Sequence, residues 1–85
     1  VRNNGRRALR AGNGGSHTVE EWQRLCETFD WRCACCGERR PLTEDHVLPI
    51  SKGGTNDIDN IQPLCGSCNS RKKDKHIDYR PQWWF

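Results

Sequence analysis

The stretch CACCGERRPLTEDHVLPISKGGTNDIDNIQPLCGSCNSRKKDK, residues 33–75, decides the fold. It contains two Cys-x-x-Cys pairs, Cys33/Cys36 and Cys65/Cys68. Four thiolates in two such pairs form a ligand set that one tetrahedral zinc ion can close. Because an 85-residue chain with 33% hydrophobic residues buries only a modest core, a structural zinc would supply stability that the core lacks.

Disulfides are the alternative use of the six cysteines, as in small secreted domains. The pairing into Cys-x-x-Cys knuckles and the lack of an apolar signal segment favour metal. Cys35 lies between the first two ligands, so it is either a spectator or a sign that the register shifts by one; we predict that Cys33 is the ligand. Thiolate ligation predicts a reducing, cytoplasmic location, and no run approaches the ~20 apolar residues that span a bilayer.

Several polar residues that a zinc scaffold does not need lie between the two cysteine pairs or just after the second pair. Near neutral pH the His46 imidazole can accept a proton from water. The oxygens of Asp45 and Asn69 are ligands that suit a divalent cation. Simpler roles are also open: Asp45 could only orient the imidazole ring, Asn60 could only form a turn, and Asn69 could only cap the last helix.

Four separated pieces of the stretch resemble, in the same order, the signature of the HNH endonucleases. They are the dipeptide Asp45-His46, then Asn60, then the second cysteine pair, then Asn69 with Lys72 three positions later. The resemblance implies a small α+β fold of the ββα-metal type, stapled by a structural zinc ion on the four cysteines. Asn69 stands where most members of the family have His, so the chain is similar to the His-Asn-Asn variant.

The resemblance also implies a role for each residue in a metal-dependent DNA endonuclease. His46 would be the general base, Asp45 and Asn69 would hold one Mg²⁺ or Mn²⁺ ion, and Asn60 would tie a loop to the strand carrying His46. A basic run after the last signature residue would contact DNA phosphates; it consists of Arg71, Lys72 and Lys73. The family includes phage, homing and restriction nucleases, which places the protein in a bacterial or phage-infected cell.

Charge supports a phosphate-binding partner, because the net charge is +3 and basic residues cluster at the start of the chain and after the second cysteine pair. One short helix and a loop offer few side chains to read bases, so we expect low sequence specificity on double-stranded DNA, with nicking or double-strand cleavage. The alternative function is a zinc-stapled module that binds nucleic acid without cutting it.

Local patterns predict the remaining organisation. Residues 1–16 form a flexible basic arm, residues 17–80 form the domain, and residues 81–85 form an aromatic tail. A Thr-x-x-Glu capping box and an apolar stripe predict a helix over residues 18–29. Short strands over Leu42–Leu48 and Asn60–Leu64 and a helix from about Ser67 follow. Because successive side chains on a strand point to opposite faces, placing both Asp45 and His46 in one site requires irregular backbone there.

Overall fold

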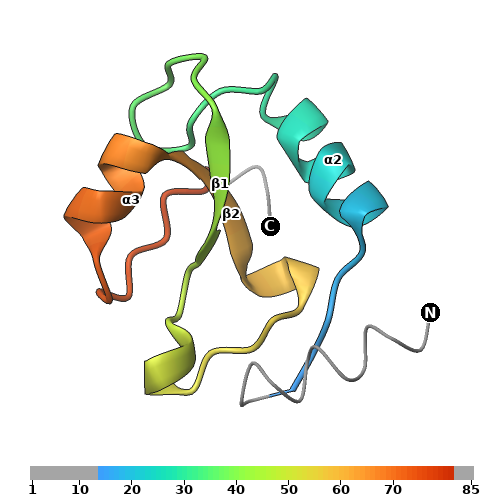
Figure 1. Ribbon diagram of the computed structural model, residues 1–85, viewed down its shortest axis with the longest axis vertical. Coiled ribbons are helices and arrows are strands. Elements are labelled where there is room, and N and C mark those ends of the chain that lie inside the picture. The colour runs from blue at the N-terminus through green and yellow to red at the C-terminus, as the bar shows by residue number, and fades with distance from the viewer. Residues whose placement is uncertain (1–13, 82–85) are drawn as a thin grey trace.

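The structure is a computed structural model that describes residues 14–81. In chain order its elements are helix α2 (Val19–Thr28), strand β1 (Leu42–His46), 3₁₀ helices η1 (Ile50–Lys52) and η2 (Ile58–Asn60), strand β2 (Ile61–Cys65) and helix α3 (Gly66–Lys72). This is the small α+β arrangement that the sequence predicts, with strand, strand and helix in the order ββα (Figure 1). Each predicted strand boundary is within two residues of the observed one.

The predicted arm and tail fall mostly outside the described part of the chain. Residues 1–13 and 82–85 are not described. The three described arm residues, 14–16, lie against the loop around Asn56, where Asn56 N donates to Gly14 O at 3.0 Å. Within residues 14–81, no helix has the length and apolar character needed to cross a membrane.

The sheet is a two-stranded antiparallel ribbon whose register runs without interruption from Leu42 to His46. Asp45 pairs with Gln62 and His46 pairs with Ile61. The irregular backbone predicted at Asp45-His46 is therefore wrong for β1. Because side chains alternate along a regularly paired strand, the carboxylate of Asp45 and the imidazole of His46 leave opposite faces of the sheet.

Helices cover both faces of this ribbon, with α3 on one side and α2 on the other (Figure 1). The α3 face carries Thr43 and Asp45, since Asn69 Nδ2 donates to Thr43 Oγ1 at 2.8 Å and Lys72 Nζ lies 3.2 Å from Asp45 Oδ2. The opposite face carries His46. The register of this one short strand thus assigns Asp45 and His46 to different faces.

Helix α2 starts at the predicted capping box. Glu21 N donates to Thr18 Oγ1 at 3.0 Å, and Thr18 N donates to Glu21 Oε1 at 2.8 Å. Its apolar stripe buries Leu25 and Cys26. Burial, with a smaller effect of the nearby Glu44 carboxylate, raises the pKa of the Cys26 thiol to about 11. The thiol therefore stays protonated near neutral pH and acts as a small buried hydrophobe.

The part of the core beside the cysteine pairs is small and rich in sulfur. Its central cluster consists of Leu64 with three cysteines, and Leu42, Ala34 and Tyr79 pack around it; the three cysteines are Cys33, Cys65 and Cys68. Since thiols at the centre of a core bring little apolar surface, the packing supports the expectation that a metal ion completes it.

Candidate functional site

The four cysteines predicted as ligands meet at one place. Their Sγ atoms all lie within 4.8 Å of one another, and the Sγ atoms of Cys36 and Cys65 are 3.9 Å apart. A tetrahedral zinc with Zn–S distances of ~2.3 Å separates its sulfurs by about 3.8 Å. The donor set and its spacing therefore fit a structural zinc ion, with Cys33 rather than Cys35 as the first ligand.

The surroundings of the Cys33 sulfur favour the thiolate form that binds metal, whereas burial raises the pKa of the Cys68 thiol. Burial raises the pKa of the Cys33 thiol, but backbone N–H groups directed at its sulfur outweigh burial and lower the pKa to about 7. Two of these donors are Cys35 N at 3.4 Å and Cys36 N at 3.5 Å. Arg71 Nη2 also donates to Cys68 Sγ at 3.2 Å. Arg71, predicted to contact phosphate, thus uses one guanidinium nitrogen on the zinc site.

Asp45 lies inside a buried polar network on the α3 face. The residue is 5% exposed, and its Oδ2 accepts from Gln62 Nε2 at 2.8 Å and lies 3.2 Å from Lys72 Nζ. Gln62 is itself fully buried; its Nε2 also donates to Ile77 O at 2.9 Å, and its Oε1 accepts from Tyr79 N at 2.8 Å. Gln62 therefore connects Asp45 to the segment that follows α3.

Lys72 is the partner of Asp45 and is not a surface residue. It is 1% exposed, and Nζ donates to the backbone oxygen of His46 at 3.0 Å in addition to its ion pair with Asp45. The predicted phosphate contact by Lys72 is wrong, because its ammonium group is directed into the protein. Lys73, the next residue, is exposed.

Asn69 lies on the same face of α3 as Lys72, one turn earlier. Its Nδ2 donates to Thr43 Oγ1, which in turn donates to Leu64 O at 2.8 Å. The structure thus brings Asp45 and Asn69 to one interface between β1 and α3, each with a different partner. Among the described residues, Asn69 Oδ1 and Asp45 Oδ1 accept no hydrogen bond. A carboxylate oxygen and a carboxamide oxygen are ligands that suit Mg²⁺ or Mn²⁺, so the donor chemistry fits such an ion.

His46 lies on the other face, half-buried at the end of β1. Its Nε2 is 2.9 Å from Asn56 Oδ1. The structure therefore does not bring the imidazole into hydrogen-bonding contact with Asp45 or Asn69. Asn56 was not singled out in the sequence, where it reads as one more polar loop residue.

Asn60 closes the loop between the strands. Its Nδ2 donates to Leu48 O at 3.0 Å and Thr55 O at 2.8 Å, and its Oδ1 accepts from Leu48 N at 2.9 Å. Gly54 lies directly beneath this contact, and a Cβ atom there would be 1.7 Å from Leu48 O. The loop can pack on Asn60 only because residue 54 has no side chain. The Asn60 side chain thus ties Thr55 in the loop to Leu48, two residues after β1.

His17 is a second residue that the sequence did not single out. Its Nδ1 is 2.7 Å from Asn56 O, and its Nε2 is 3.0 Å from Glu44 Oε1. No local sequence pattern could have indicated that His17 contacts Glu44 and Asn56, because these residues lie 27 and 39 positions further along the chain.

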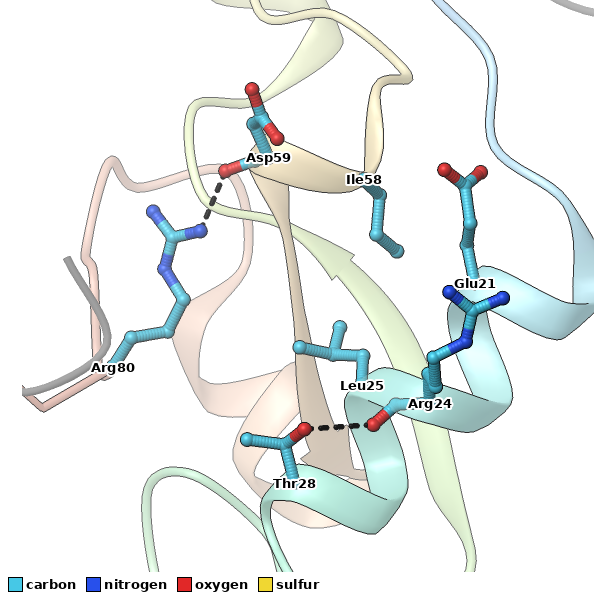
Figure 2. A pocket seen from close by; sticks show the side chains of 7 residues that line it. All are labelled: Glu21, Arg24, Leu25, Thr28, Ile58, Asp59 and Arg80. Atoms are coloured by element: carbon cyan, nitrogen blue, oxygen red, sulfur yellow. Dashed lines mark hydrogen bonds between the residues drawn. The ribbon is translucent and has the colours of Figure 1, made fainter.

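A hollow on the described surface lies elsewhere (Figure 2). It has a volume of about 520 Å³ and lies between α2 and η2; it is lined by Glu21, Arg24, Leu25, Thr28, Ile58, Asp59 and Arg80. None of the candidate residues lines it. The Arg80 guanidinium in the wall of this hollow already binds Asp78 and the backbone oxygen of Asp59. We therefore do not assign the catalytic site to this hollow.

Comparison with known proteins agrees with the fold and with the cysteine frame. Residues 33–75 match the family model described as HNH endonuclease, and this segment is half of the chain. The chain therefore belongs to the HNH endonuclease family. It is similar to the "SPbeta prophage-derived putative HNH endonuclease YoqL" of Bacillus subtilis (strain 168), with 35% identity over 72 residues. The match covers 67% of this chain but 30% of that protein. No solved structure matches the chain.

Proposed function

We propose that this chain is a metal-dependent endonuclease that hydrolyses phosphodiester bonds of double-stranded DNA, by nicking or by cutting both strands. The observation that carries the proposal is the placement of His46 in a chain of this family. The imidazole is half-buried at the open end of β1, and Asn56 holds one of its two nitrogens. The seven-residue helix α3 offers few side chains to base edges, which supports low sequence specificity.

His46 would act as the general base. Asn56 Oδ1 is an acceptor only, so the contact to Nε2 requires an N–H on that nitrogen. A neutral ring then carries its lone pair on Nδ1. This atom takes the proton from water as the water oxygen attacks phosphorus and the bond to the 3′ oxygen breaks.

Asp45 and Asn69 would hold a Mg²⁺ or Mn²⁺ ion through their side-chain oxygens. Such an ion supplies positive charge to the phosphate oxygens and to the leaving 3′ oxygen. Since the ribbon has two strands, the outer edge of β1 has no strand partner in the described sheet. For both residues to act on one phosphodiester, the substrate would have to lie across this edge, with Asp45 on one face and His46 on the other.

Exposed basic residues near α3 would contribute to holding the DNA backbone. Lys73 is exposed and Arg71 keeps guanidinium nitrogens beyond the one bound to Cys68. Contacts of this kind release counterions, so DNA affinity should fall steeply as salt rises.

Plasmid nicking tests the proposal. Supercoiled DNA is incubated with Mg²⁺ or Mn²⁺ and with wild type, His46→Ala or His76→Ala. His76 is exposed and serves as the matched control. Loss of a general base should slow nicking by about 10²–10⁴-fold, while His76→Ala should cut at the wild-type rate. Nicking that survives in His46→Ala contradicts the assignment of the base.

A nucleic-acid-binding module without activity is the second candidate, and one observation favours it. The Lys72 ammonium already neutralises the Asp45 carboxylate that would bind the divalent ion. Salt-dependent binding of DNA by the wild type, with no nicking in either metal, would support this function and overturn the endonuclease.

A further inference from the structure

A chain of hydrogen bonds links His17 to His46 across the face of the sheet opposite α3. His17 Nδ1 lies 2.7 Å from the backbone oxygen of Asn56, and the side-chain Oδ1 of Asn56 lies 2.9 Å from His46 Nε2. The same residue, Asn56, thus binds one histidine through its backbone and the other through its side chain. His17 lies outside the segment 33–75 that matches the family.

We propose that His17 is a positioning residue for the reaction, acting through Asn56 to fix the orientation and the tautomer of the His46 ring. The proposal rests on the proposed function, because it takes His46 as the base. In this arrangement Asn56 hydrogen-bonds to the base, and within residues 14–81 the His17 ring hydrogen-bonds to Asn56 and Glu44 and not to His46.

The His17 ring is well held in its place. Its side chain is 7% exposed, and its two nitrogens face two acceptors, the backbone oxygen of Asn56 and the carboxylate of Glu44. Glu44 and His46 are two positions apart on β1, so both project from the same face of the strand. One rigid ring therefore ties the loop that carries Asn56 to the strand that carries His46.

The backbone before α2 adds to this clamp. Asn56 N donates to Gly14 O at 3.0 Å, and Ser16 N donates to Asp57 Oδ1 at 3.1 Å. Gly15 has a φ of +83°, and a Cβ atom at this position would lie 2.6 Å from Asp57 Oδ1. Both the conformation and the close approach require glycine here. Residues 14–17 thus hold the loop at several points.

This arrangement decides which nitrogen of the His46 ring is available to accept a proton from water. While Asn56 Oδ1 stays in place, Nε2 of His46 carries the proton and Nδ1 is left for water. If the loop drifts, the ring is free to rotate and to exchange tautomers, and a fraction of molecules presents the wrong nitrogen. DNA contacts are not altered by this change, so the turnover number should fall while KM stays nearly constant.

The test compares His17→Ala, Asn56→Ala and Gly15→Ala with Val19→Ala as the matched control. Val19 lines the same hollow of about 350 Å³ as His17 and is 64% exposed, with no part in the hydrogen-bond chain. Nicking is measured at several DNA concentrations. Long-range ¹H–¹⁵N NMR of the histidine rings reports the tautomer of His46 without any need for activity. Zinc content and urea unfolding identify variants that do not fold.

We expect Val19→Ala to match the wild type. Asn56→Ala and His17→Ala should lower kcat by about tenfold or more with KM within about twofold, and the His46 ring should change from the Nε2–H form to a mixture. Gly15→Ala reaches the loop by a different route and should show the same pattern. A wild-type tautomer and kcat in folded His17→Ala overturn the inference. Undiminished nicking in His46→Ala overturns the proposed function instead.

Discussion

Replacing Lys72 by Met tests how the buried ion pair supports the fold. The substitution keeps an aliphatic stem of similar length and removes the ammonium group. The Lys72 side chain is fully buried and that of Asp45 is 6% exposed, so solvent cannot neutralise the carboxylate that is left behind. Removing one partner of a buried pair costs about 3–5 kcal/mol. A domain of this size has a total stability of roughly 4–13 kcal/mol, so the loss is a large fraction of the whole.

Unfolding by urea, with zinc present, is monitored by tryptophan fluorescence. Lys73→Met is the matched control, because Lys73 is adjacent and exposed; its effect should stay within about 0.5 kcal/mol. The double variant Asp45→Asn/Lys72→Met removes both charges and keeps an acceptor for Gln62. It should be more stable than Lys72→Met alone by at least about 1 kcal/mol, because no unpaired charge remains buried.

Two outcomes would refute this reasoning. If Lys72→Met and Lys73→Met unfold at the same urea concentration, the Lys72 ammonium is not held inside the protein. If Lys72→Met unfolds like the wild type but loses DNA affinity and part of its salt dependence, Lys72 contacts phosphate, as the resemblance implies.

The remaining predictions concern local features. Thr18→Ala removes the capping bond of α2 and should cost about 1 kcal/mol in urea unfolding; an unchanged midpoint contradicts the cap. With zinc bound, iodoacetamide at pH 8 should label the exposed Cys35 and leave Cys26, whose pKa is raised to about 11 by burial, because thiolate is scarce below about pH 10. A strong chelator should expose the remaining thiols and abolish the circular dichroism of the fold; retention of the signal argues against a structural metal. Asn60→Ala should accelerate hydrogen exchange at Leu48 N, which now donates to Asn60 Oδ1; unchanged exchange shows that the loop holds without it.

The features that the sequence predicts best are those set over a few positions. The capping box depends on residues three apart, and the cysteine frame depends on two short knuckles, so both patterns are visible without knowledge of the fold. The first strand begins at Leu42 as predicted, and the other three strand boundaries differ from the predicted ones by one or two residues. Tertiary packing decides such ends, and local preferences do not.

Lys72 was wrongly predicted to contact DNA phosphates because the basic run from Arg71 to Lys73 was treated as a single exposed surface. Asn69 and Lys72 are three positions apart on a helix, so they share a face. If Asn69 is to reach a site on β1, Lys72 must point toward β1 as well, while Lys73 points away. The three-residue spacing of Asn69 and Lys72 therefore already implied that the lysine faces β1.

For β1, the alternation of side chains in the sequence was a better guide than the family resemblance. Alternation along β1 places Asp45 and His46 on different faces, and the resemblance to a family whose members use both residues suggested an irregular backbone instead. The uninterrupted register shows that alternation was the better guide. The contacts of His17 and Asn56 were out of reach for a different reason. They join His17, which precedes the first cysteine pair, to residues 27 and 39 positions later, and only the folded chain brings them together.

The candidate metal ligands and the candidate base lie on different faces of the ribbon. On the α3 face, Asp45 is bound by Gln62 and Lys72, so a divalent ion at Asp45 has to share the carboxylate with Lys72 or displace it. Displacement would leave a buried ammonium without its partner, and this cost weakens the apparent affinity for the ion. On the other face, His46 is oriented without any ion, through Asn56. Under the proposed function, the base is therefore oriented before any ion binds, and the β1–α3 interface is where a divalent ion would be held by Asp45 and Asn69.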